Sequence, residues 1–288
     1  MVYSLYVLKR WLKIIRWQAR RARSALVWGA DSLAAAPIVF GNAMAKSGSH
    51  LLIQVLEGLL PLGPFVDPGF PPVNRFEDNR KLTEQQIIAG IQQMKPGDIR
   101  YGYISAKEPY LSLLTGPNRA TIFIYRDPRD LLVSHVFYAT EMYEDHALRP
   151  YLSDSLSTME ERLNAVIAGI DEPGFEFSNV RQRYESYWGW FSQPGVLCLP
   201  FEDLILDRDQ AIGRLLDYLC GFNFKLRVSR EEAITILKNS IAPRKSGTFR
   251  KGQPGNWRDH FTDANKVLFK EVAGDLLIRL GYETSNEW

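Results

Sequence analysis

The sequence predicts an α/β fold in which helices cover both faces of a parallel β-sheet. From Pro37 onward, short apolar runs typical of buried strands alternate with longer segments of helical periodicity, which is the pattern of a parallel sheet with crossover helices. The chain contains no internal repeat and no low-complexity segment. We therefore expect a single domain over residues 37–288, preceded by an N-terminal extension over residues 1–36.

The composition is that of a globular protein with a packed core. The chain has 288 residues, 45% of them hydrophobic, and a formal net charge of +2. Its two cysteines form no CxxC pair and its four histidines show no metal-ligand spacing, which favours a reducing compartment and predicts no metal. No window of eighteen apolar residues occurs, so we expect no transmembrane helix and a cytoplasmic catalytic part.

The N-terminal extension has the pattern of a basic amphipathic helix. Apolar residues gather on one side of a wheel over residues 7–26: Val7, Leu8, Trp11, Leu12, Ile14, Ile15, Ala22 and Leu26. Basic residues gather opposite: Lys9, Arg10, Lys13, Arg16, Arg20, Arg21 and Arg23. Two interpretations stay open: the helix lies on an anionic membrane surface as a peripheral anchor, or it packs on the domain and leaves a solvated basic face.

The strands and helices of the domain follow in order from residue 37. Strands are expected at 38–40, 99–103, 120–125 and 196–199. Helices are expected at 48–60, 84–94, 128–140, 178–192, 207–220, 229–239 and 264–280. The segment 61–80 is rich in Pro and Gly and too long for a plain connector, so we expect it to line a substrate site.

The first candidate anion site is the turn G41-N-A-M-A-K-S-G-S-H-L-L52 between a strand and a helix. The strict triphosphate motif G-x-x-x-x-G-K-[ST] is absent, because Lys46 and Ser47 come one residue early and Gly48 follows them. The turn nevertheless directs helix-start N–H groups and a lysine ammonium toward anionic oxygens, in a P-loop-like arrangement. The alternative is a glycine-containing turn with a surface lysine.

The second candidate site is A120-T-I-F-I-Y-R-D-P-R-D-L-L-V-S134. Arg126 ends a buried strand at the carboxyl edge of the predicted sheet, where ligands bind in open α/β folds. Ser134 lies about two helical turns further on. The alternative is that Arg126, Asp127, Arg129 and Asp130 form exposed ion pairs at a helix start.

The third candidate site is F249-R-K-G-Q-P-G-N-W-R-D-H-F-T262. Gly252 and Gly255 permit close backbone approach to a ligand, and Arg250 and Lys251 supply donors for a phosphate dianion. A flexible basic loop is the alternative. Together, the three anion-binding loops suggest a ligand with phosphate-like groups at both ends.

At these three loops the chain resembles the sulfotransferases that use 3′-phosphoadenosine 5′-phosphosulfate (PAPS). K46-S-G-S49 resembles their 5′-phosphosulfate loop, R126-D-P-R-D-L-L-V-S134 their 3′-phosphate segment, and R250-K-G-x-x-G-x-W257 their C-terminal signature. L199-P-F-E-D-L204 resembles a further conserved stretch. Order and spacing agree from about residue 37 to 262.

The resemblance implies PAPS as the sulfuryl donor and no metal. It assigns the 5′ phosphosulfate to the loop of Lys46, Ser47, Gly48, Ser49 and His50. It assigns the 3′ phosphate to Arg126, Ser134, Arg250, Lys251 and Gly252. A sulfuryl group passes through a planar transition state that resembles metaphosphate, so well-placed positive charge should supply most of the catalysis. Lys46 is then expected to stabilise the leaving 5′ phosphate.

The chain departs from the family at several positions. Leu51 stands where the family has a tryptophan that stacks on adenine, and Asp263 breaks its dimerisation pattern. Tyr103 stands where small-molecule members have a catalytic histidine, and tyrosine, with an ordinary pKa near 10, is a weak base at neutral pH. Alternatives for the base are Tyr103 with a lowered pKa, His50, or a carboxylate: Glu108, Asp67 or Glu77. Tyr103 as a half-buried strand aromatic is also open.

The sequence thus predicts a sulfotransferase that moves a sulfuryl group from PAPS to an acceptor hydroxyl of a small molecule, lipid or sugar. One alternative is an ATP-dependent kinase on a P-loop-like fold, which requires Mg²⁺. Another is a catalytically inactive PAPS-binding or membrane-associated protein. No feature indicates a nucleic-acid partner.

Overall fold

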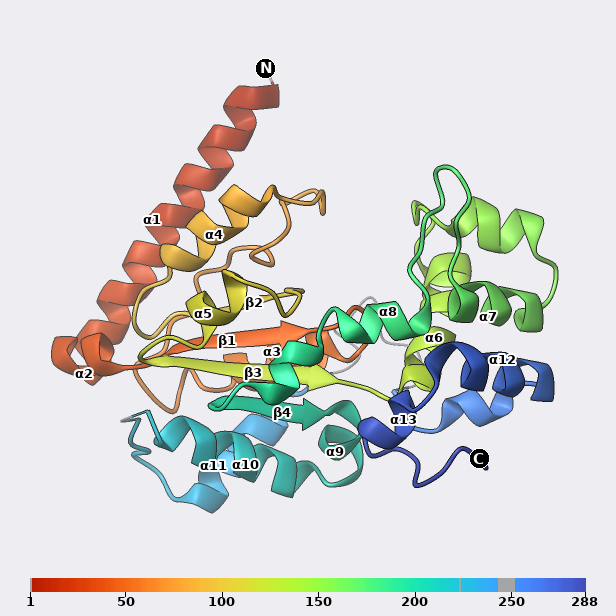
Figure 1. The fold of residues 1–288 in the computed structure, drawn as a ribbon. Helices are drawn as coiled ribbons and strands as arrows, with labels where there is room; N and C mark the ends of the chain where they lie inside the picture. The colour runs from red at the N-terminus through yellow and green to blue at the C-terminus, as the bar shows by residue number, and fades with distance from the viewer. Residues whose placement is uncertain (1, 223, 243–251) are drawn as a thin grey trace. The chain divides into compact units, whose positions relative to one another are not determined.

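The computed structural model describes residues 2–222, 224–242 and 252–288 (Figure 1). These form two compact units. The first unit consists of Met1–Tyr125 and Gly189–Lys245, and the second unit of Arg126–Trp188 and Ser246–Trp288. The predicted boundary at residue 36 stays a prediction.

The first unit is built on a four-stranded parallel sheet. Its strands are β1 (Ile38–Ala43), β2 (Ile99–Gly102), β3 (Arg119–Tyr125) and β4 (Val196–Pro200), in the order β2-β1-β3-β4. All six residues of β1 are buried, as expected for a central strand covered on both faces. The predicted α/β fold class is confirmed, and all four predicted strands are present.

Helices cover both faces of this sheet. The structure has helices at α1 (Val2–Trp28), α2 (Ala30–Ala35), α3 (Ser49–Glu57), α4 (Glu84–Gln92), α5 (Tyr110–Leu114), α9 (Phe201–Leu206), α10 (Arg208–Cys220) and α11 (Arg230–Ser240) in the first unit. Ile122 and Ile124 of β3 point into a core shared with α3, α9, α10 and α11. Phe123, between them, packs against Phe191 on the opposite face. Figure 1 shows α4 and α5 on one side of the strands and α10 and α11 on the other.

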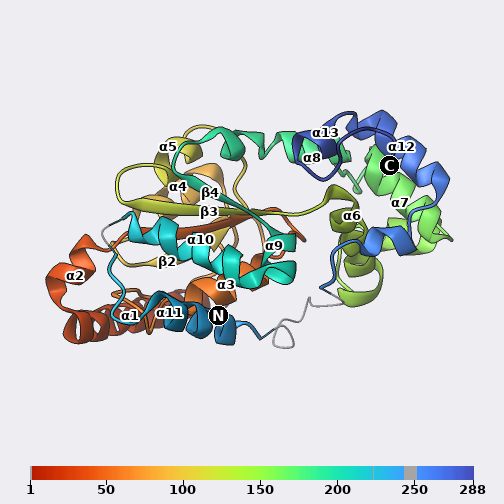
Figure 2. The same ribbon diagram turned by 90° about the horizontal axis from the view of Figure 1, so that it is seen from below.

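The second unit is helical. It contains α6 (Pro128–Phe137), α7 (Met159–Ala168), α8 (Val180–Glu185), α12 (Asp263–Ala273) and α13 (Leu276–Arg279), with π-helical turns at Tyr138–Met142 and Pro150–Ser155. Helices α7 and α12 lie side by side in both views (Figure 2). Buried Asn265 of α12 donates from Nδ2 to Asn164 Oδ1 at 2.8 Å and joins the two helices.

Several helix boundaries differ from prediction. The predicted helix 264–280 is broken at Gly274, whose φ of 59° belongs to the left-handed region that favours glycine. The predicted helix 178–192 consists of α8 and a separate 3₁₀ helix, Trp188–Ser192. Helices α2, α5, α7 and α9 were not predicted; α2, α5 and α9 have at most six residues, too short for a clear periodic signal.

Helix α1 packs on the first unit through a side that carries basic residues together with Ile14 and Trp17. Lys13 Nζ lies 2.6 Å from Glu77 Oε1, and Arg20 Nη1 lies 3.0 Å from Asp67 Oδ2. Arg21 pairs at 2.9 Å with the carboxylate of Asp98. These three cations of the predicted basic side therefore pair with acidic side chains of the domain, while the side chains of Lys13 and Arg20 keep 29% and 48% of their exposure.

The apolar side of α1 is instead exposed. Trp11, Ile15 and Leu26 are 62%, 55% and 87% exposed, and Leu12 and Val27 are also exposed. No described helix is both long enough and apolar enough to cross a bilayer. Arg16 and Arg23 lie exposed on the same helix. The exposed side of α1 is therefore both apolar and basic.

Candidate functional site

The predicted 5′-phosphosulfate loop connects β1 to α3 and is held by a buried serine. The Ser47 hydroxyl, fully buried, lies 2.8 Å from Met44 O and 3.0 Å from Ile124 O, so it ties the loop to the end of β3. The Ser47 N–H donates to Met44 O. This geometry makes Ser47 a support of the loop, and its contact with a donor stays a prediction.

Two left-handed residues give this loop its shape. Lys46 has a φ of 71° and Gly48 a φ of 98°. A Cβ on Gly48 would lie 2.4 Å from Phe201 Cδ2, closer than real contacts allow. Gly48 is therefore required both for its φ and for the approach of the Phe201 ring. It directly precedes α3, whose first N–H groups have no partner within the helix and face outward as anion donors.

The start of α3 brings three predicted site residues together. Buried Ser49 places its Oγ 3.0 Å from the Tyr103 hydroxyl. His50 follows on the exposed side of the helix. Partial burial of its ring, and then the charge of Lys46, lower the pKa of His50, so its imidazole is neutral at pH 7 and able to accept a proton.

Tyr103 is held from its backbone as well as from its hydroxyl. It directly follows β2, and its N–H donates to Asn74 Oδ1 while its carbonyl accepts from Asn74 Nδ2 at 3.1 Å. Its ring packs at the edge of the core. Tyr103 is thus partly buried against the core, as one prediction had it. Its hydroxyl also lies beside Ser49 at the predicted anion loop, as the other prediction requires.

The predicted carboxylate alternatives have other partners. Glu108, which precedes α5, accepts a hydrogen bond from the Ser112 hydroxyl at 2.7 Å. Glu77 and Asp67 pair with Lys13 and Arg20 of α1. Each of these carboxylates therefore has a local structural role.

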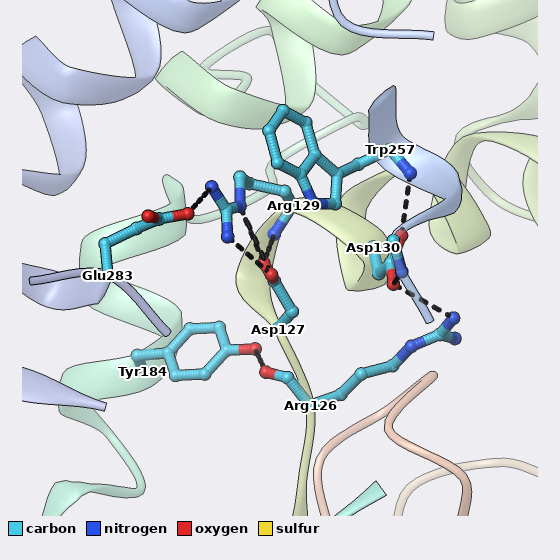
Figure 3. Close-up of polar contacts among 8 residues, drawn as sticks. Arg126, Asp127, Arg129, Asp130, Tyr184, Trp257 and Glu283 are labelled. Carbon is cyan, nitrogen blue, oxygen red and sulfur yellow. Dashed lines mark hydrogen bonds and ion pairs between the residues drawn. The ribbon is translucent and has the colours of Figure 1, made fainter. Parts of the chain in front are cut away.

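In the second unit, Arg126 and Asp130 organise the predicted 3′-phosphate segment (Figure 3). Both are buried, with Arg126 Nη2 3.8 Å from Asp130 Oδ2. Asp130 also accepts the N–H groups of Gly255 and Trp257, at 2.7 and 2.8 Å. Burial raises the pKa of Asp130. The Tyr184 hydroxyl donates to Arg126 O at 2.7 Å and fixes the backbone there.

Arg129 forms a second buried centre beside this pair. It is 2% exposed, and its guanidinium lies 4.0 Å from the Trp257 ring centroid and 4.5 Å from that of Trp288. It forms ion pairs with Asp127 and Glu283. The alternative of exposed ion pairs at the helix start is therefore wrong, because all four charged side chains of this segment are buried.

The other residues predicted for the 3′ phosphate are only partly described. Ser134 lies half-buried on α6. Gly252 has a φ of 61°, which suits a backbone turn at a ligand. Arg250 and Lys251 lie outside the described residues.

Sequence reasoning missed Asp130 and Arg129 as organisers of this segment. Asp130 joins residues more than one hundred positions apart in the chain, and no local pattern encodes such a contact. The available signal was the high density of charges at 126–130 together with the tryptophans of the C-terminal region. Among the described residues, no group of three His, Cys, Asp or Glu side chains is placed to hold a metal ion.

Comparison with protein families identifies a match to a sulfotransferase domain. The sulfotransferase domain family matches residues 109–281, more than half of this chain. The 3-alpha-hydroxysteroid sulfotransferase of Cavia porcellus is 25% identical over 169 residues, covering 52% of this chain and 53% of that protein. The chain thus spans about half the length of that relative. The flavonol 3-sulfotransferase of Flaveria bidentis is 23% identical over 255 residues, covering 78% of this chain and 77% of the relative.

Solved structures share the fold. Mouse sulfotransferase SULT7A1 complexed with PAP superimposes with a TM-score of 0.59 at 16% identity, covering 86% of this chain and 87% of that one. Retinol dehydratase in complex with androsterone and inactive cofactor PAP gives a TM-score of 0.54 at 16% identity, covering 85% and 83%. At such low identity the likeness concerns the fold.

Proposed function

The chain belongs to the sulfotransferase family, as its loops predicted, and we propose that it transfers a sulfuryl group from PAPS to the hydroxyl of a small acceptor molecule. The observation that carries this proposal is the turn from β1 into α3. There Lys46 and Gly48 adopt left-handed conformations ahead of a helix N-terminus, and Ser49 joins the turn to Tyr103. An anion donor and an acceptor hydroxyl could both be held at this point of the first unit.

Each end of the donor has its own set of residues in the proposal. Lys46, Gly48, Ser49 and His50 hold the 5′ phosphosulfate, with Ser47 supporting the loop. In the second unit, Arg126, Ser134 and Gly252 contact the 3′ phosphate, together with Arg250 and Lys251. PAPS supplies the activated sulfuryl group.

Charge stabilisation is the main catalytic contribution that we assign to this chain. The acceptor oxygen bonds to sulfur as the bond from sulfur to the 5′-phosphate oxygen breaks, which leaves negative charge on that phosphate. The Lys46 ammonium and the first N–H groups of α3 are suited to stabilise it.

The proton of the acceptor hydroxyl needs a base, and Tyr103 and His50 are the two candidates beside the loop. Tyr103 is our first choice, because Ser49 and Asn74 fix its position. If Tyr103 is the base, Tyr103→Phe lowers kcat far more than His50→Asn does. If His50→Asn has the larger effect instead, the assignment goes to His50. Glu108→Gln serves as the control, because Glu108 pairs with Ser112.

The acceptor is proposed to be a hydroxysteroid or a flavonoid. The curated relatives carry such names, one a 3-alpha-hydroxysteroid sulfotransferase and one a flavonol 3-sulfotransferase. The predicted lipid and sugar acceptors remain proposals that the same assay can test. The kinase alternative is not favoured, because the matched family and the curated relatives are sulfotransferases.

The test is a transfer assay with radiolabelled PAPS in EDTA, using a 3-hydroxysteroid and a flavonol as acceptors. We expect label on an acceptor with the native chain, and a loss of at least a hundredfold in Lys46→Ala but not in the exposed-lysine control Lys225→Ala. Binding of adenosine 3′,5′-bisphosphate without turnover of any acceptor would favour the inactive alternative. Mg²⁺-dependent transfer from ATP would favour the kinase.

We also propose that α1 docks on an anionic membrane surface through its exposed side. Trp11, Leu12 and Ile15 are exposed apolar side chains, and Arg16 and Arg23 are exposed on the same helix. Apolar insertion and attraction to anionic lipid act together in such helices. Cosedimentation with vesicles containing phosphatidylserine should fall in Leu12→Ser/Ile15→Ser and not in Leu206→Ser, which removes an exposed leucine of α9. Equal sedimentation of both variants would refute docking.

A cytoplasmic location is part of the proposal. The two cysteines, Cys198 and Cys220, are both free thiols, and free thiols persist in reducing compartments.

A further inference from the structure

A cavity of about 680 Å³ lies in the first unit beneath α1. Its walls come from α1, the segment 70–82, α4 and the first half of β2. Ile14, Trp17, Phe70, Phe76 and Leu82 supply apolar walls. This volume is in the range of pockets that hold drug-sized ligands.

The walls of this cavity are held by contacts that exist without a ligand. Trp17 of α1 donates from Nε1 to Asp98 Oδ1 at 2.9 Å, and its ring meets Phe70 edge-on with centroids 5.7 Å apart. Lys13 pairs with Glu77 across the rim. The cavity is thus preformed, which lowers the entropic cost of binding.

Arg100 of β2 is the cation in the wall that most needs a partner. Its Nε is buried and makes no hydrogen bond within the described part of the chain. Its Nη2 reaches only Pro71 O, at 3.3 Å, and its guanidinium lies 5.0 Å from the Phe70 ring centroid. Burial lowers the pKa of Arg100 to about 10, so it stays charged at pH 7.

The carboxylate of Asp98 in the wall does not satisfy Arg100. Asp98 accepts hydrogen bonds from Trp17 and Arg21 and from the Lys95 N–H. A buried donor without a hydrogen bond carries a desolvation cost that a bound acceptor removes. An anion bound in this cavity would form both an ion pair and a hydrogen bond with the Arg100 guanidinium.

We propose that this cavity is a binding site for an amphipathic anion, with the apolar body against Trp17 and Phe70 and the carboxylate, sulfate or sulfonate head at Arg100. No residue of the loop 44–50 lines it. Arg100 precedes Tyr103 by three residues, about 10 Å along an extended strand. The lining thus shares no residue with the site proposed for sulfuryl transfer, and the binding test does not depend on that activity.

The probes are dodecanoate and dodecan-1-ol, compared by calorimetric titration of the full chain. We expect dodecanoate to bind one to one, and at least tenfold more tightly than the alcohol. Arg100→Met should remove that preference. Arg227→Met is the control, because Arg227 also lies over a ring, Trp28, but does not line the cavity.

A second variant tests the cavity without touching Arg100. Gly90 lines the cavity, and a Cβ there would meet nothing closer than 4.0 Å, so Gly90→Phe should fill the space without disturbing the backbone. We expect it to abolish dodecanoate binding and to leave binding of adenosine 3′,5′-bisphosphate unchanged.

Three outcomes would overturn the proposal. The first is the absence of saturable dodecanoate binding. The second is equal affinity for acid and alcohol with no effect of Arg100→Met. The third is competition between dodecanoate and a sulfated acceptor together with a raised KM in Gly90→Phe, which would make the cavity part of the acceptor site.

Discussion

Replacing Gly48 by alanine should destabilise the protein for two separable reasons. The first is conformational: a φ of 98° is unfavourable for a residue with a Cβ, and left-handed backbone costs about 1–2 kcal/mol. The second is steric: the new Cβ would lie 2.4 Å from Phe201 Cδ2, and overpacking of a buried site costs about 1–3 kcal/mol. The total loss of unfolding free energy should be about 2–5 kcal/mol.

Gly195→Ala isolates the conformational cost. Gly195 lies in the same unit with a φ of 88°, and a Cβ added there would have no other heavy atom within 4 Å. Urea unfolding followed by tryptophan fluorescence should give about 1–2 kcal/mol for Gly195→Ala. Phe201→Leu should relieve part of the extra cost when combined with Gly48→Ala. Equal losses for the two glycine variants would refute the claim that the Phe201 ring requires a glycine at position 48.

Three further predictions concern named contacts. Asp130→Asn loses one of two backbone acceptor bonds, so the unfolding free energy should fall by about 1.5–3 kcal/mol; a change below about 0.5 kcal/mol would contradict the role given to this carboxylate. Ser49→Ala and Tyr103→Phe should each cost about 0.5–1.5 kcal/mol, and the double variant should cost little more than one single variant; strict additivity would argue against their hydrogen bond. His50 has a lowered pKa in the folded state, so as the pH falls below about 6.5 the unfolded chain binds a proton at His50 more readily than the folded chain does, and the unfolding free energy falls. His50→Asn should make the urea midpoint less dependent on pH between pH 5 and 7. The same pH dependence in the native chain and in His50→Asn would speak against the shift.

The strands and the anion loop could be predicted from sequence because their signals are local. A buried parallel strand appears as a continuous apolar run, and both β1, at residues 38–40, and β3, at residues 122–125, contain one. The loop between β1 and α3 carries its glycine and lysine within eight residues. Order and spacing of such short segments are visible without any tertiary contact.

The orientation of α1 and the burial of Arg129 could not be predicted, because both depend on distant partners. The basic residues of α1 pack toward the domain because Glu77, Asp67 and the buried carboxylate of Asp98 pair with Lys13, Arg20 and Arg21. Arg129 is buried because Trp257, more than one hundred residues away, covers its guanidinium. Amphipathic pattern alone assigns the apolar side to the interior, and here the ion pairs decide otherwise.

The proposed function requires that this chain bind the nucleotide of PAPS without a metal. Calorimetric titration with adenosine 3′,5′-bisphosphate in EDTA tests it most directly, with ATP as a second ligand. We expect saturable one-to-one binding that Lys46→Ala and Arg126→Ala each weaken at least tenfold, about 1.4 kcal/mol, while Lys225→Ala and Arg181→Ala do not. No binding in EDTA, or binding of ATP alone in the presence of Mg²⁺, would rule out a PAPS site in this chain.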